Sequence, residues 1–112
     1  MVKEILTAAG IQERGSRFLK PPAGTYAVWF VDIAATAPDH APACIFTHNV
    51  TIELYEPKKD EAAVDALEAE LTGRGLEWTK QDRLWISSEQ MYQTVYEFTH
   101  TKKKEDVTNE AR

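Results

Sequence analysis

Three side chains that commonly bind metal ions recur at intervals of four residues: His40, Cys44 and His48. On a helix this spacing would place all three on one face, where they could hold a tetrahedral zinc ion. Pro42 interrupts the series, however, and the alternating pattern that begins at Ile45 is typical of a strand. A strand spreads the three residues too far apart for one ion, so we expect neither a metal site nor a cofactor. The alternative assignment is a solvated loop histidine, a small apolar cysteine and a half-exposed strand histidine.

Carboxylates and hydroxyls, which act as acids, bases and nucleophiles in enzymes, occur without a recognisable catalytic setting. Glu53 with Glu56, and Glu89 with Glu97, form acidic pairs, but a chain with 18 acidic residues is expected to carry such pairs on its surface. The serines lack a Gly-x-Ser-x-Gly motif, and no glycine-rich phosphate loop is present. We therefore expect a protein that is not an enzyme.

The composition restricts the class of protein further. The chain has 112 residues, with 13 basic and 18 acidic residues and a net charge of -5, which disfavours nucleic acid as the principal ligand. Cys44 is the only cysteine, so an intrachain disulfide is excluded and a reducing cytoplasm is the expected environment. No apolar run approaches the ~18 residues needed to span a bilayer, so a soluble protein without a membrane partner is expected.

Hydrophobic periodicity predicts two helices and two hairpins, with each helix preceding a hairpin. The expected elements are a helix over 2–9, a connecting segment over 11–24, strands over 25–33 and 45–55 joined by a loop over 34–43, a helix over 60–72 and a hairpin over 76–98. This α-β-β-α-β-β order predicts an α+β fold, a single domain over residues 1–101 with helices packed on a mainly antiparallel sheet. Residues 102–112 are polar and non-periodic, so a flexible C-terminal tail is expected there.

The hairpin from Trp78 to Phe98 is unusually rich in aromatic residues. Alternation places Tyr92, Tyr96 and Phe98 on one face of its second strand, and we expect these three to pack under the helix over 60–72. The opposite face carries polar residues. No reactive group accompanies this pattern, which favours a surface for assembly over a site for catalysis.

Three tryptophans and two polar side chains supply the remaining expectations. We expect Trp29 and Trp78 to fill the core between sheet and helices. Trp85 lies on the opposite face from its apolar neighbours, so it is a candidate anchor at a protein interface. Gln93 and Glu97, on the polar face of the hairpin, are candidates for contacts with another subunit.

Four segments of the chain resemble a known family. They are Arg17-Phe-Leu-Lys-Pro-Pro22, Thr51-Ile-Glu-Leu-Tyr-Glu-Pro57, Trp78-Thr-Lys-Gln-Asp-Arg-Leu-Trp-Ile86 and Glu89-Gln-Met-Tyr-Gln-Thr-Val-Tyr-Glu-Phe98. Their order and content are similar to the tail terminator, or tail completion, proteins of long-tailed bacteriophages and prophages. The resemblance covers most of the chain, and its two last segments are the most specific. It implies an α+β fold and a role in joining heads to tails.

The resemblance also implies partners and a place of action. Such proteins often form hexameric rings that cap the tail tube, so the implied partners are further copies of the chain, the major tail tube protein and the head-tail connector proteins. The implied location is the host bacterial cytoplasm during assembly and then the head-tail junction of the virion. Asp39 and His40 lie in the long loop, our candidate for an arm that reaches a neighbouring subunit. The alternatives are a head-side completion protein and an accessory protein that binds a host protein.

Overall fold

The structure, a computed structural model, describes residues 1–15, 21–36 and 45–103, and it confirms the predicted α+β fold. Its elements in chain order are α1 (Val2–Ala8), β1 (Gln12–Gly15), β2 (Tyr26–Thr36), β3 (Ile45–Glu56), α2 (Glu61–Gly73), β4 (Trp78–Lys80), β5 (Leu84–Ile86) and β6 (Met91–Lys103). Within the described ranges, no helix is long and apolar enough to cross a membrane.

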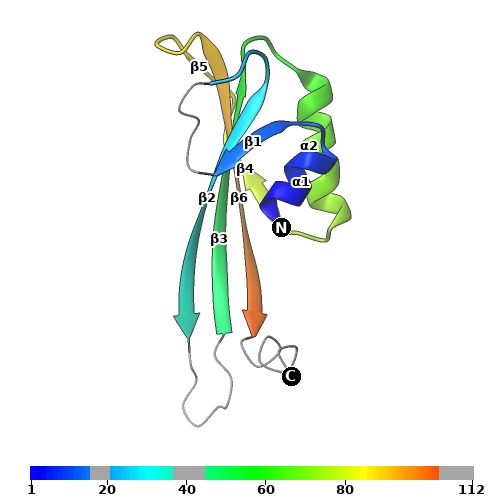
Figure 1. The fold of residues 1–112 in the computed structure, drawn as a ribbon, viewed down its shortest axis with the longest axis vertical. Coiled ribbons are helices and arrows are strands. Elements are labelled where there is room, and N and C mark those ends of the chain that lie inside the picture. Colours follow the sequence, from blue (N-terminus) through cyan, green and yellow to red (C-terminus); the bar gives the residue numbers. More distant parts are fainter. Residues whose placement is uncertain (16–20, 37–44, 104–112) are drawn as a thin grey trace.

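One mainly antiparallel sheet carries the fold, and both helices lie against the same face of it (Figure 1). The strand order is β1-β2-β3-β6-β4, and β5 pairs with β6 further along the same strand. The central strand β3 pairs antiparallel with β2 on one side and with β6 on the other, whereas β1 pairs with β2 in parallel. One face of the sheet is thus covered by helices, and we call the other the helix-free face.

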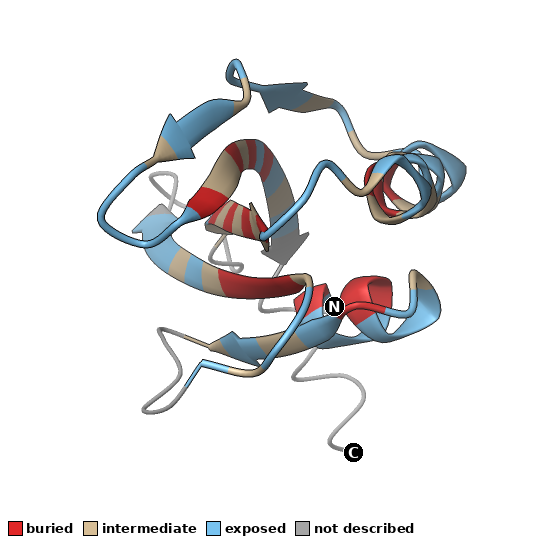
Figure 2. Ribbon diagram, turned by 90° about the horizontal axis from the view of Figure 1, so that it is seen from above, coloured by how far each residue is buried: buried red, intermediate tan, exposed pale blue. Residues whose placement is uncertain are grey.

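The core lies between the helices and the sheet, where Figure 2 shows the buried residues concentrated. Leu67 and Leu71 from α2 are fully buried together with sheet residues that include Ile52 and Tyr96. The phenolic hydroxyl of Tyr96 donates a hydrogen bond of 2.8 Å to Glu68 Oε2, so this large side chain is anchored to α2 at its polar end. Burial and this hydrogen bond both raise the pKa of Tyr96 above its ordinary value.

The predicted packing of the aromatic residues is confirmed except at Tyr92. Phe98 and Tyr96 belong to the core cluster, and Trp29 and Trp78 pack against it while remaining partly exposed. Tyr92 is different, because it lies opposite Glu56 beyond the edge of the cluster. The prediction that Tyr92 packs under the helix was wrong for a geometric reason. Residue alternation shows which face of a strand a side chain lies on, but not how far the helix extends over that face.

Both helix boundaries agree with the signals in the sequence. Asp60 caps α2, with its Oδ1 accepting a hydrogen bond of 3.1 Å from the backbone N–H of Ala63. After α1 the chain turns at Gly10, whose φ of 74° is strained for residues with a side chain. The helices therefore begin and end for local reasons.

Strand β1 corrects the prediction of a connecting segment over residues 11–24. Residues Gln12–Gly15 pair with β2 in parallel, and Glu13 Oε1 accepts a hydrogen bond of 2.9 Å from Trp29 Nε1. The absent side chain of Gly15 leaves room for the indole ring, which would lie 3.1 Å from an added Cβ. This strand has no apolar alternation, and it is stabilised by its neighbour rather than by its own sequence pattern.

The two long hairpins extend further than predicted. Strand β2 continues through Thr36 instead of ending at residue 33, and β6 continues through Lys103, into the segment predicted as a tail. As a result β2, β3 and β6 run well past the helices (Figure 1). We call this part, made of Asp32–Thr36, Ile45–Asn49 and Thr99–Lys103, the three-stranded extension.

The predicted hairpin over 76–98 exists, but its first strand is interrupted. Strands β4 and β5 both pair with β6, and residues 81–83 separate them without ladder pairing. This interruption brings Arg83 back toward the end of β3. Its partner there is Glu56, 27 positions earlier in the chain.

Candidate functional site

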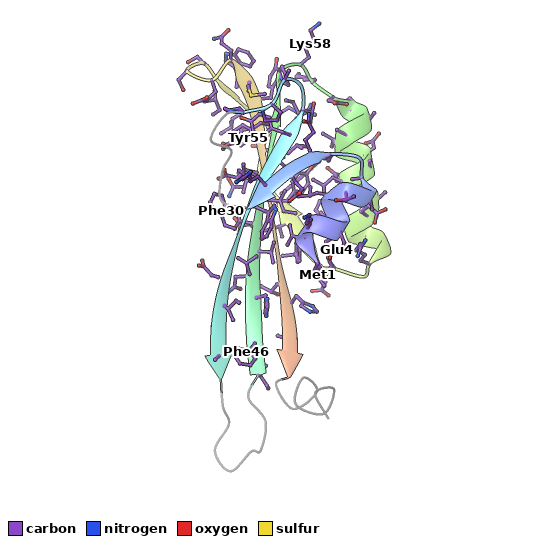
Figure 3. The ribbon with its side chains drawn as sticks, in the orientation of Figure 1. Met1, Glu4, Phe30, Phe46, Tyr55 and Lys58 are labelled. Atoms are coloured by element: carbon purple, nitrogen blue, oxygen red, sulfur yellow. The ribbon has the colours of Figure 1, made fainter. Side chains whose placement is uncertain are left out.

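The helix-free face contains a hollow of about 580 Å³ near the end of the sheet that carries β5. Apolar and aromatic side chains make most of its wall, and carboxylates and an amide stand among them. The lining residues are Pro21, Tyr26, Val28, Phe30, Glu53, Tyr55, Ile86, Ser88, Glu89 and Gln93. Figure 3 shows Phe30 and Tyr55 on the side of the sheet away from the helices.

Two tyrosines from neighbouring strands form the rigid part of this hollow. The rings of Tyr26 and Tyr55 are stacked, with centroids 5.2 Å apart. The Tyr55 hydroxyl donates a hydrogen bond of 2.9 Å to Glu53 Oε1 and accepts one of 2.9 Å from Gln93 Nε2. Each polar group in the chain Gln93–Tyr55–Glu53 therefore has a partner, which fixes the orientation of the Tyr55 ring.

Burial and the hydrogen bond to Glu53 raise the pKa of Tyr55 to about 12. A tyrosine in the unfolded chain ionises near the ordinary value of 10.0. Between these two pH values the folded protein holds a proton that the unfolded chain has lost, so the free energy of unfolding falls as pH rises. The contribution of this group is complete below pH 10 and is lost toward pH 12.

Substitution Tyr55→Phe is expected to make the alkaline loss of stability shallower. The variant lacks the proton that the folded wild type retains, so its free energy of unfolding should fall less steeply between pH 10 and pH 11. Urea unfolding at several pH values measures both slopes. The variant also loses two hydrogen bonds, which lowers its stability at every pH, so the slope is the relevant readout. Equal slopes would show that Tyr55 ionises normally in the folded protein.

A second polar cluster lies on the opposite side of the sheet, where Arg83 meets the end of β3. Arg83 Nε and Nη2 donate hydrogen bonds of 3.2 and 3.1 Å to the two oxygens of Glu56, and Nη1 donates one of 2.8 Å to Glu61. Glu56 has no exposed surface, and it also accepts a hydrogen bond of 2.7 Å from the backbone N–H of Asp60. The hydrogen bond to Glu61 and the charge of Glu56 raise the pKa of Arg83.

The geometry of this cluster indicates a structural role. The buried Glu56 carboxylate accepts hydrogen bonds at both oxygens, from the guanidinium and from a backbone N–H, so neither oxygen is directed at a ligand. The cluster ties the interruption between β4 and β5 to the start of α2. We therefore treat the hollow, and not this cluster, as the candidate site for a partner.

Of the predicted interface residues, the structure describes Trp85, Gln93 and Glu97, and it places them at separate positions. Gln93 lines the hollow, whereas Glu97 lies four residues further along β6 and accepts a bond of 3.4 Å from Gln81. Trp85 pairs with Tyr92, on the opposite face from Gln93, and its ring packs edge-on against Tyr92 with centroids 4.9 Å apart. Its exposed fraction of 47% agrees with the prediction of an exposed tryptophan. Asp39 and His40 lie outside the described residues.

Of the three possible metal ligands His40, Cys44 and His48, the structure describes only His48. His48 lies on strand β3, as the sequence pattern indicated, and faces His100 on β6 with ring centroids 6.0 Å apart. Among the residues that the structure describes, no three potential metal ligands lie together. His40 and Cys44 fall outside those residues.

The sequence pattern missed the main residues of the hollow. Tyr26, Glu53 and Tyr55 alternate with core residues on their strands, and this alternation already placed Glu53 and Tyr55 on one face. What it could not show is that two tyrosines 29 positions apart in the chain would stack. The arrangement suits an apolar or aromatic side chain with a hydrogen-bond donor next to it.

No family model matches the sequence, and no curated protein sequence matches it. The fold is similar to that of a chain in the solved virion of a native gene transfer agent particle, with a TM-score of 0.57. The match covers 85% of this chain and 81% of that chain, with 15% sequence identity. Similarity at this level of identity establishes a shared fold.

Proposed function

We propose that this protein is a virion assembly protein of long-tailed phages or prophages that caps the tail tube, ends its polymerisation and provides the surface for head-tail joining. The observation that carries the proposal is the similarity of the fold, over 85% of this chain, to a chain of a gene transfer agent virion. The four segments that resemble tail terminator proteins support the same function independently. The proposed partners are further copies of this chain, the major tail tube protein and the head-tail connector proteins.

The proposed mechanism is geometric. A homohexameric ring binds the last ring of tail tube subunits through one surface and so prevents the next ring from adding. Its other surface receives the connector of the head. A ring of identical subunits needs two different lateral patches on each subunit, because heterologous contacts must close on themselves. This mechanism requires surfaces and no catalytic group.

Several large apolar side chains are available for such contacts. They are exposed by 42% at Phe30, 59% at Ile33, 56% at Leu84 and 47% at Trp85. Phe30 lines the hollow, Leu84 and Trp85 lie on β5, and Ile33 lies on the three-stranded extension. Their separation supports contacts with more than one neighbour, since a single patch could not cover both ends of the sheet.

Deletion of the gene from the phage or prophage that encodes it tests the function. Electron microscopy of the lysate is expected to show tails of uncontrolled length and tails unattached to heads. Supplying the wild-type gene from a plasmid should restore joined virions, which controls for effects on neighbouring genes. Normal, joined virions in the deletion strain would refute the proposal.

The same micrographs distinguish the head-side alternative. A head-side completion protein should leave tails of normal length beside heads that fail to join or that lose their DNA. An accessory protein directed at the host should leave virions intact and should be missing from purified particles by mass spectrometry. Tails of uncontrolled length are expected only for a protein that ends tube polymerisation.

A further inference from the structure

The three-stranded extension has an open edge on each side. Strand β1 covers β2 only from Tyr26 to Trp29, and β4 covers β6 only as far as Phe98. Beyond these positions, no described strand pairs with the outer side of β2 or of β6. Among the residues that the structure describes, the outward backbone N–H and C=O groups of both outer strands thus lack a strand partner.

The two edges differ in the residues that usually protect such edges: the β6 edge carries Lys102 and Lys103, whereas the β2 edge has no lysine. Between Phe30 and Thr36 the sequence has no proline and no lysine, and Asp32 is its single charged residue. Ile33, in the middle of this stretch, is 59% exposed. Long apolar edges of this kind readily accept a strand from another chain, and they are normally blocked when pairing would be harmful.

The two open edges match in height and direction. Asp32 and Thr99 both pair with Asn49 of the central strand, and at the other end Thr36 and Lys103 both pair with Ile45. Each edge thus has the same length and lies at the same level of the sheet. Both strands are antiparallel to β3, so they run in the same direction.

We infer that neighbouring copies of this chain join by parallel strand pairing, with the β2 edge (Asp32–Thr36) of one copy against the β6 edge (Thr99–Lys103) of the next. This inference rests on the ring in the proposed function and supplies its lateral contact. Copies related by a rotation about an axis along the strands bring these edges together at equal height and in parallel. A closed ring made this way leaves no open edge on the extension.

Pairing of β2 with itself is the main competing geometry. Two β2 edges would meet antiparallel across a twofold axis, which gives a closed dimer and leaves both β6 edges open. Pairing of β2 with β6 satisfies both edges of every copy. The equal levels of the edges, which have no role in a β2 dimer, favour the second arrangement.

The inferred pairing also fixes which face of the joined sheet lines the ring. The helices form a thick layer on one face, and a closed sheet has more room for such a layer on its outer circumference. The helix-free face would then line the lumen. On and next to the extension, β3 and β6 give this face the polar residues Thr47, Asn49, Thr51, Glu97, Thr99 and Thr101, whereas β2 adds the apolar Phe30 and Ala34 beside Asp32.

Cysteine cross-linking of the full chain tests the inference. In a Cys44→Ser background, the double variants Ala34→Cys/Thr101→Cys and Ala34→Cys/Thr99→Cys place thiols on the two edges in two registers. Within one copy these positions are two strands, or roughly 10 Å, apart, which is too far for a disulfide. After mild oxidation, at least one double variant is expected to give a ladder of disulfide-linked oligomers on a non-reducing gel. Each single variant is expected to stay about tenfold less cross-linked.

Every outcome of the cross-linking decides between the geometries. Dimers from Ala34→Cys alone would show β2 pairing with itself and overturn the inference. An oligomer in native mass spectrometry that gives no ladder from either double variant would place the contact elsewhere, leaving the proposed function intact. Monomers without cross-links at any concentration would show that the edges have no affinity for each other, and would also overturn it.

A charged edge provides a second measurement. Ile33→Lys introduces the kind of residue that protects natural edges, and it is expected to reduce cross-linking of the double variant about tenfold or more. Leu84→Lys is the matched control, because Leu84 is similarly exposed but lies on β5. Equal cross-linking in both variants would contradict the role of the edge. The deletion phenotype tests the proposed function separately.

Discussion

Replacing Arg83 with methionine is expected to lower the free energy of unfolding by about 3–5 kcal/mol, the usual cost of breaking a buried ion pair on one side. Glu56 is completely buried, and Arg83 supplies two of the hydrogen bonds to its carboxylate. Without the guanidinium, the carboxylate keeps only the backbone N–H of Asp60. The variant must therefore bury an uncompensated charge or take up a proton. Urea unfolding followed by circular dichroism measures the loss.

Two further variants separate the buried pair from the surface pair of the same cluster. Glu61→Gln removes the charge of a side chain that is 65% exposed, so a loss within about 1 kcal/mol is expected. The double variant Glu56→Leu/Arg83→Met removes both buried charges and should be more stable than Arg83→Met alone. A loss in Arg83→Met no larger than in Glu61→Gln would show that Glu56 is solvated, contrary to this account.

Replacing Leu67 with alanine is expected to cost about 2–5 kcal/mol, since the change leaves a cavity at the centre of the core. Leu67 is fully buried on α2, between the helix and the central strands of the sheet. Most of the stability of such a helix comes from docking its apolar side, so loss of this contact weakens the whole layer. Thermal and urea unfolding both report the change.

Leu84→Ala is the matched control for Leu67→Ala. The chemical change is identical, but Leu84 is 56% exposed on β5, and its truncation should leave stability within about 1 kcal/mol. If Leu84→Ala lowered the free energy of unfolding as much as Leu67→Ala, the contribution of a leucine to stability would not depend on its burial. The assigned core would then be incorrect. This variant also leaves the three-stranded extension unchanged, so the edge experiments can use it as well.

Local signals accounted for the boundaries of the two helices to within a residue. The cap at Asp60, the turn at Gly10 and the alternation in β3 each depend on neighbours a few residues away, so the spacing of residues in the chain is enough to predict elements of this kind. The packing of Tyr96 and Phe98 under α2 also followed from alternation. These features are determined by spacing in the chain and were confirmed.

The errors arose where a residue depends on a distant partner. Strand β1 has no pattern of its own and exists because β2 pairs with it. In the sequence, Arg83 is an ordinary polar residue of a hairpin. Only the fold brings it next to the carboxylate of Glu56, 27 positions earlier in the chain. The position of Tyr92 beyond the core depends on the length of α2 relative to the sheet, which no single strand encodes.

In the candidate site too, features of a single strand were predictable from the sequence, and relations between strands were not. Alternation placed Gln93 and Glu97 on one face of β6 and Trp85 on the opposite face from its apolar neighbours, and their role in an interface remains a prediction. The stacked tyrosines of the hollow are contributed by β2 and β3, and their hydrogen-bonded partner Gln93 comes from β6. Such a grouping depends on strand register, which spacing along one strand cannot give.

The sequence by itself determined the α+β class, the helix boundaries and the core-facing side of β6, because these depend on periodicity and on local hydrogen bonds. The tertiary structure alone decided the buried Glu56–Arg83 pair, the tyrosine hollow and the two open edges at equal height. Each of these is a relation between strands, fixed by register and by the long-range burial of side chains. The register of each strand depends on the burial of side chains across the whole sheet, so it cannot be derived from one strand alone.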